Sequence, residues 1–387
     1  MKRLKAIIPL AILIIALMTV LLLKAGATHA TSAQSTCGTW NVVSSPNPGV
    51  NNVFDGISAI SNKDIWAVGY SDNQTLTEHW NGTNWSVIPS ANASAQDLLD
   101  AVTAISTNDV WAVGQIGNYP SSLVLTEHWN GTNWSVFPSP APGVSSTFTG
   151  VSRIPGSKNV WAVGHYTDSG GIDSTLIELW NGVNWSIIPS PNNTGQGDDL
   201  LGVVALSTKD AWAVGTYLDN SGNQLTLTEH WNGTSWSIVP SPNVAGNGVL
   251  WAVARVPGSN HLWAVGTYQN SSGVSLTLTE YWNGKNWKVV LSPSVVGLNS
   301  TLFAVTVLSA SNAWAVGDAY NNSGGNQALI EHWNGKNWKI VPSPNENGDS
   351  LLTGVTYTPD TDPVWAVGVT YSGGGSQTVT ENYCQSK

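Results

Sequence analysis

One column of residues in this 387-residue chain varies in a way that could carry chemistry. The tetrapeptide Trp-Ala-Val-Gly occurs seven times, and aligning the seven copies gives columns of equivalent residues, one from each repeat. Two carboxylates and two large aromatic rings at one site could bind a sugar or a cationic ligand, by stacking and by charge-assisted hydrogen bonds. Trp251, Asp55, Asp100 and Phe303 are therefore candidate ligand-binding residues, and a plug of channel-filling side chains is the alternative. These candidates come from the variable column, which lies shortly before each tetrapeptide and reads Asp55, Asp100, Thr149, Leu201, Trp251, Phe303 and Thr353.

The arginines supply a second pair of candidates. Apart from Arg3, the chain holds only Arg153 and Arg255, and both occupy one column of the third and fifth repeats. A guanidinium binds carboxylates and other anions through two parallel hydrogen bonds. Arg153 and Arg255 are therefore expected either to pair with buried acids or to bind an anionic group of a ligand.

Established catalytic and metal motifs do not account for this chain. A glutamate recurs in all seven repeats, from Glu78 to Glu381, whereas a catalytic acid is needed once or twice, so this column is structural. The adjoining histidine column contains Leu179, Tyr281 and Asn382, which argues against zinc. Loops such as 219–223 suit turns better than calcium sites. We expect no catalytic residue, metal or cofactor, although Asp55 with Asp100 could form an unrecognised catalytic pair.

The repeats define the elements that must position these residues. Each repeat is predicted to hold four strands, which in the second repeat are 100–105, 110–114, 124–129 and 133–137. Asn130-Gly131 is typical of a tight hairpin. Within Trp-Ala-Val-Gly the large residues share one face and the small ones the other, so adjacent sheets can interlock. The sequence predicts an all-β, seven-bladed β-propeller of four-stranded antiparallel blades.

The two ends of the repeat array complement each other. The seventh repeat stops after Glu381-Asn382-Tyr383-Cys384, and residues 37–43 match the missing outer strand. The N-terminal strand is therefore expected to complete the last blade and close the ring. The two cysteines, Cys37 and Cys384, would meet at this seam, and we predict a disulfide that stabilises the ring by about 2–4 kcal/mol.

The predicted domain boundaries follow from this register. Residues 1–33 form a signal peptide or N-terminal membrane anchor, and residues 34–387 form the propeller. Its blades span about 50–90, 97–139, 146–190, 198–241, 247–292, 299–343, and 350–384 with 37–46.

The repeat resembles the kelch repeats of galactose-oxidase-like proteins. The resemblance rests on the period of about 51 residues, the strand that ends in Gly, and two aromatics five residues apart around the outer hairpin. A single Gly stands where kelch repeats usually carry two. The resemblance implies a propeller over residues 37–384. A galactose-oxidase copper site uses a cysteine cross-linked to tyrosine, and both cysteines here are assigned to the seam.

The N-terminus has the pattern of an export signal. Lys2, Arg3 and Lys5 precede an uncharged stretch over 6–23, and Ala25-Gly26-Ala27 offers a cleavage site. The protein is expected to be secreted or held at the cell surface, with a membrane contact only through 6–23 if the segment stays uncleaved. The net charge of −10 argues against nucleic acid as a partner.

Strand parity predicts two unlike rims. One rim carries short turns, and the other carries long loops such as 115–122, 166–174 and 189–199. Binding sites concentrate on long loops held by a rigid scaffold. The leading hypothesis is therefore an exported, non-enzymatic monomer whose loop-rich rim binds a protein or glycan. The alternatives are a multivalent lectin with repeated inter-blade sites and a glycan-active enzyme.

Overall fold

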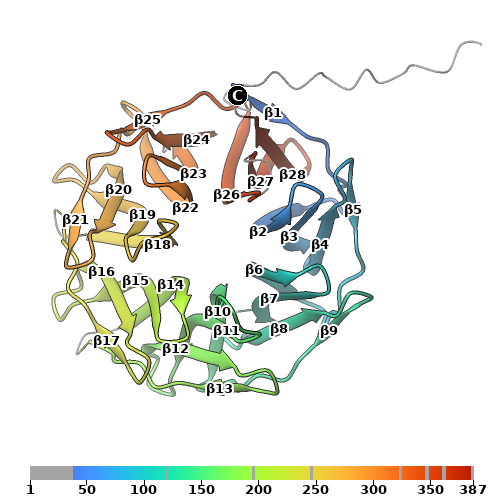
Figure 1. Ribbon diagram of the computed structural model, residues 1–387, viewed down its shortest axis with the longest axis horizontal. Helices are drawn as coiled ribbons and strands as arrows, with labels where there is room; N and C mark the ends of the chain where they lie inside the picture. Colours follow the sequence, from blue (N-terminus) through green and yellow to red (C-terminus); the bar gives the residue numbers. More distant parts are fainter. Residues whose placement is uncertain are drawn as a thin grey trace, which may run out of the picture. The chain divides into compact units, whose positions relative to one another are not determined.

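The computed structural model describes residues 38–118, 120–193, 197–244, 247–321, 325–344, 348–359 and 363–384, which form strands and turns (Figure 1). No helix in these ranges is long and apolar enough to cross a membrane. The predicted signal segment lies outside the described residues. Residues 37–387 form a compact unit of their own, and its hydrophobic clusters draw only on residues between 40 and 383.

The described residues form 28 strands, grouped four by four in a circular arrangement (Figure 1). Each group is antiparallel and begins with its innermost strand. The first two groups are β2 (Asn52–Ser61), β3 (Asp64–Ser71), β4 (Gln74–Trp80), β5 (Trp85–Val87), and β6 (Asp97–Ser106), β7 (Asp109–Ile116), β8 (Leu123–Trp129), β9 (Trp134–Val136).

The next three groups repeat this plan. They are β10 (Ser145–Arg153), β11 (Val160–Thr167), β12 (Asp173–Trp180), β13 (Trp185–Ile187); β14 (Gly197–Ser207), β15 (Asp210–Leu218), β16 (Gln224–Trp231), β17 (Trp236–Ile238); and β18 (Asn247–Arg255), β19 (Leu262–Gln269), β20 (Ser275–Trp282), β21 (Trp287–Val289). A single parallel bridge from Asp173 to Gly197 joins the third group to the fourth.

The last two groups bring the chain back to its start. They are β22 (Asn299–Ser309), β23 (Asn312–Tyr320), β24 (Asn326–Trp333), β25 (Trp338–Ile340); and β26 (Asp349–Tyr357), β27 (Val364–Ser372), β28 (Gly375–Tyr383), completed by β1 (Trp40–Val42). Trp40 pairs with Tyr383, and the Gly38 amide donates to the Cys384 carbonyl at 2.7 Å. The N-terminal strand thus lies where the repeat comparison predicted it.

The predicted disulfide involves Cys37, which lies outside the described residues, so the bond itself stays a prediction. The backbone contact between Gly38 and Cys384 brings the two ends of the chain together at this seam. The first and last sheets also contact each other, because the Thr353 hydroxyl donates to the Phe54 carbonyl at 2.6 Å.

Adjacent sheets interlock through the Trp-Ala-Val-Gly strands. Trp66 and Val68 of one sheet pack against the next, where Ala112 offers a small surface, and all three side chains are buried. The Trp66 ring meets the edge of Trp134 at a centroid distance of 5.3 Å. This confirms the expected division of large and small residues between the two faces.

The outer hairpin differs in detail from the prediction. Trp129 pairs with Trp134, so the loop spans four residues, 130–133, rather than a two-residue Asn-Gly turn. The Asn130 side chain accepts hydrogen bonds from the amides of Thr132 and Asn133, and Gly131 has φ of 91°. Asn and Gly are therefore needed here for a side-chain-stabilised loop and a left-handed backbone.

Every inner strand carries a β-bulge at the variable column. In the second sheet Leu99 pairs with Gly114 and Ala101 with Val113, which leaves Asp100 as the extra residue. The tetrapeptide glycine permits this close approach, since a Cβ on Gly114 would lie 2.2 Å from the Leu98 carbonyl oxygen. The same shift occurs in the other six inner strands.

Candidate functional site

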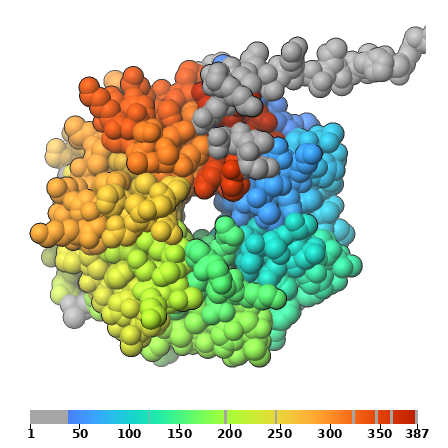
Figure 2. All heavy atoms as spheres, in the orientation of Figure 1, coloured from blue at the N-terminus to red at the C-terminus, as the bar shows by residue number. Residues whose placement is uncertain are grey.

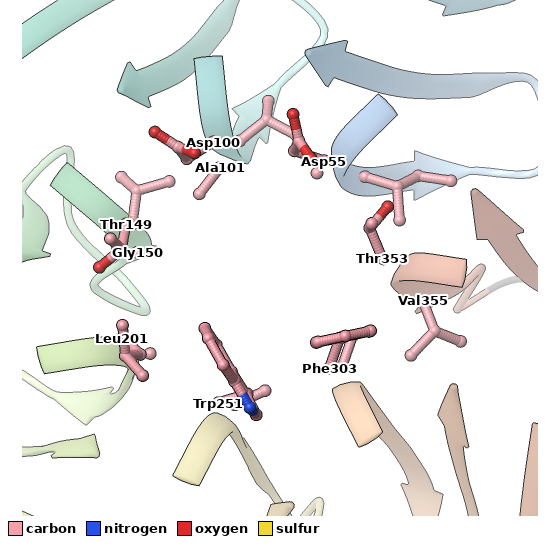
Figure 3. A pocket seen from close by; sticks show the side chains of 18 of the residues that line it. Asp55, Asp100, Ala101, Thr149, Gly150, Leu201, Trp251, Phe303, Thr353 and Val355 are labelled. Carbon is pink, nitrogen blue, oxygen red and sulfur yellow. The ribbon is translucent and has the colours of Figure 1, made fainter. Parts of the chain in front are cut away.

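The seven bulge residues surround the central channel (Figure 3). Each inner strand contributes its bulge residue and the next two residues to a cavity of about 230 Å³. Figure 2 shows the opening in the middle of the ring. Because a bulge residue has no partner across the ladder, its type can change without disturbing the sheet. The channel lining is thus a part of this repeated scaffold where the residue type differs from sheet to sheet.

The two acids of this column are neighbours on one side of the channel (Figure 3). Enclosure by the surrounding strands raises the pKa of Asp55 to about 7. The same enclosure, and then the nearby charge of Asp55, raise the pKa of Asp100 well above its usual range. Two carboxyls held this way favour a shared proton or a cationic group between them.

The two aromatic residues lie together on the opposite side of the channel (Figure 3). The rings of Trp251 and Phe303 pack edge to face, with centroids 5.7 Å apart and an angle of 72° between planes. The structure therefore brings together the four residues that the sequence singled out, as an acidic side and an aromatic side of one cavity.

The threonines of the column serve the scaffold. The Thr149 hydroxyl donates to the Leu200 carbonyl at 2.6 Å, and the Thr353 hydroxyl donates to the Phe54 carbonyl at the same distance. Each bond links one inner strand to the next around the channel.

Two grooves lie beside the channel on the loop-rich rim. The larger, of about 540 Å³, is lined by Tyr70, Tyr371 and Asp72, and the smaller, of about 220 Å³, by Tyr70, Gln96 and Asn118 among others. Burial, followed by the negative charge of Asp55, raises the pKa of Tyr70. The Tyr70 hydroxyl is therefore within electrostatic reach of the channel acids.

Sequence reasoning missed Tyr70 and Tyr371. Their setting depends on connections that are shorter than expected for this rim: β3 and β4 are joined by residues 72–73, and β27 and β28 by 373–374. Asp72 and Asn73 have φ of 47° and 72°, the left-handed conformation of a two-residue turn. The sequence signal for these grooves was the absence of a long loop between the second and third strands of the first and seventh repeats.

Arg153 and Arg255 do not join this site. They end strands β10 and β18, at the far end from the bulges. Arg255 donates from Nε to the Ser259 carbonyl at 2.8 Å and from a terminal nitrogen to the Leu206 carbonyl. Within the described ranges neither arginine is paired with a carboxylate, so the predicted pairing with buried acids is not found.

The glutamate column is structural, as predicted. All seven carboxyls are buried, and Glu127 and Glu178 accept hydrogen bonds at 2.6 Å from Ser90 and Ser139, which precede the sheet that carries the glutamate. Burial raises the pKa of Glu178 to about 7. The histidine column is also structural, for example in the 2.9 Å contact of His128 with Asp109.

No protein-family model and no curated protein match the chain. Solved structures do resemble it: YCF48 bound to a D1 peptide (15% identity, 91% of this chain and 99% of that chain, TM-score 0.56) and streptogramin B lyase (14%, 89% and 96%, 0.55). An ulvan lyase is also similar (9%, 89% and 97%, 0.55). At these identities the likeness shows the fold alone: the chain is an all-β protein with a β-propeller fold.

Proposed function

We propose that this chain is an exported, non-enzymatic binding scaffold. In this proposal it is a closed seven-bladed propeller of kelch-like type, and its channel mouth and loop-rich rim bind a protein or a glycan. Pairing of β1 with β28 and the contact between Thr353 and Phe54 support closure. The export pattern of residues 1–33 supports a location outside the cytoplasm.

One observation carries the binding role. Seven equivalent bulges could hold seven equivalent residues, yet they place two acids opposite two aromatic rings in one cavity. A ligand can stack on Trp251 and Phe303 while it donates hydrogen bonds to Asp55 and Asp100. The similar structures include a peptide complex and a polysaccharide lyase, so this fold accommodates both ligand classes.

The test begins with the protein lacking residues 1–33 on glycan and peptide arrays, followed by titration calorimetry of the strongest hit. Trp251→Ala should weaken binding at least about fivefold, because an aromatic contact contributes about 1 kcal/mol or more. The melting temperature of the Trp251→Ala protein should stay nearly unchanged. The control is Val183→Ala, since Val183 is 82% exposed in a hairpin loop of the other rim.

The outcomes separate ligand binding from scaffold stability. Intact binding with a large drop in melting temperature would show that Trp251 only fills the channel. Several equivalent sites per chain would favour the multivalent lectin instead.

The pairing of Asp55 with Asp100 favours a glycan-active enzyme as a second candidate. Two neighbouring carboxyls with raised pKa values can act as a general acid and a base. Turnover across a polysaccharide panel, abolished in the Asp55→Asn/Asp100→Asn double variant, would support catalysis. Ligand binding without turnover would favour the scaffold.

A further inference from the structure

The positive charges of the described chain lie at or near the rim that carries the short turns. The nine lysines and arginines in these ranges lie in short turns, at the ends of inner strands, or in the outer strands β21 and β25. By position, Lys63, Lys158 and Lys209 lie in inner-strand turns, Arg153 and Arg255 at strand ends, Lys285 and Lys336 in hairpin loops, and Lys288 and Lys339 in outer strands.

The loop-rich rim has the opposite charge. Of the described residues, its loops and adjoining strand ends contain no lysine or arginine. The acids there are Asp72, Asp97, Asp168, Asp173, Asp198, Asp199, Asp219, Asp318 and Asp349. The short-turn rim holds only three described acids, Asp64, Asp109 and Asp210, and each is paired with a histidine.

The cations of the short-turn rim are available to a partner. Lys63, Lys158, Lys209, Lys285 and Lys336 are exposed. No carboxylate forms an ion pair with them in the described part of the chain. They come from the first, third, fourth, fifth and sixth sheets, so they are spread around the ring rather than gathered in a pocket. An extended anionic surface could contact several of them at once, whereas one small ligand could not.

The chain also enters the folded unit at this rim. Gly38 lies beside Cys384, at the end of β28 where the outer hairpin turns of the other sheets lie. The preceding residues include the hydrophobic stretch 6–23. We propose that the short-turn rim is a docking surface for an anionic membrane, with the loop-rich rim directed away from the lipid. This inference does not depend on which ligand the channel binds.

The net negative charge of the protein is compatible with such docking. The inner strands have 9–11 residues, which at about 3.3 Å per residue separates the two rims by roughly 30 Å. Electrostatic interactions are screened over about 8–10 Å at physiological ionic strength. The lysines would therefore interact with lipid phosphates while the acids of the other rim contribute little repulsion.

The test uses the protein lacking residues 1–33, because the hydrophobic stretch would bind any bilayer. Residues 37–387 form a unit with its own core, and circular dichroism would verify its folding. Sedimentation with phosphatidylglycerol/phosphatidylcholine vesicles should show binding that high salt abolishes, and pure phosphatidylcholine vesicles should not bind. The triple variant Lys158→Gln/Lys209→Gln/Lys285→Gln should bind the anionic vesicles at least about tenfold more weakly.

A matched control separates the rim from net charge. Ser169→Asp/Ser221→Asp/Ser272→Asp lowers the net charge by the same three units in the same three sheets, but in exposed loops of the other rim. It should bind nearly as the parent protein does. Equal weakening by both triple variants, no weakening by the lysine variant, or no binding of the parent protein to anionic vesicles would overturn the proposal. The proposal would also be overturned if the protein bound soluble polygalacturonate instead of anionic vesicles and the lysine variant weakened that binding.

Discussion

Asp55 and Asp100 show how the channel changes the chemistry of single residues. The charge of Asp55 contributes to the raised pKa of Asp100. Asp55→Asn should therefore lower the pKa of Asp100, which carboxyl ¹³C NMR titration would measure. Asp168→Asn, in an exposed loop, should leave the Asp100 titration unchanged. An unchanged pKa of Asp100 in Asp55→Asn would show that the two carboxyls do not interact.

Residue-level prediction succeeded where the repeats supplied a comparison. Trp251 stood out because the other tryptophans occupy repeated positions, and the structure places it in the lining of the channel. The position of Tyr70 in the grooves beside the channel was not predictable in this way. It depends on a two-residue turn that leaves a groove beside the ring, and residue type alone does not reveal a groove.

The bulge is the element that joins the scaffold to the site, and its glycine is open to test. In Gly368→Ala the new Cβ would lie 2.0 Å from the Leu351 carbonyl oxygen, so the bulge could form only with a backbone shift. We expect a loss of about 3 kcal/mol or more in the free energy of unfolding, measured by urea denaturation.

Gly374→Ala in the same sheet is the matched control, since its Cβ would meet no atom within 4 Å. This variant should unfold near the parent midpoint. A Gly368→Ala protein as stable as the Gly374→Ala protein would contradict the proposed role of the tetrapeptide glycine.

Strand number and order were predictable from the sequence, whereas the bulge was not recognised. Phe54, Ile57 and Ala59 belong to one hydrophobic cluster, so the spacing along this inner strand is three residues and then two. A regular strand repeats every two residues, and the extra residue marks the bulge. The same variable column therefore reaches the channel by a local irregularity that strand parity does not predict.

At the scale of the whole molecule, the net charge of the chain and the distribution of its charged residues over the two rims carry different information. The net charge of −10 argued against nucleic acid as a partner, and it described the chain as a whole. Folding separates that charge, because the alternation of strands sends the lysine-bearing turns to one rim and most aspartates to the other. The net charge cannot show this separation. The order of the turns along each repeat could have predicted it, because alternate turns lie on opposite rims.

The buried glutamates predict how stability varies with pH. Burial raises the pKa of Glu178 to about 7, and burial raises that of Glu331 to about 8 despite its hydrogen bond from Ser292. Below about pH 4.5 these carboxyls are protonated in both the folded and the unfolded chain. Between about pH 4.5 and 8 the unfolded chain ionises first, so unfolding releases protons and the free energy of unfolding falls as pH rises.

Melting temperatures from pH 5 to pH 9, measured by calorimetry, should therefore decrease steadily. The double variant Glu178→Gln/Glu331→Gln keeps a hydrogen-bond acceptor for each serine but has no proton to lose. Its decrease should be shallower, with a gain of about 3 kcal/mol per carboxyl at pH 8, since each pKa unit corresponds to about 1.4 kcal/mol. Asp219→Asn serves as the control, because hydrogen bonds from Asn223 lower the pKa of Asp219 and its loss cannot flatten this slope. A melting temperature that rises toward pH 8 would mean that these carboxyls ionise freely within the fold.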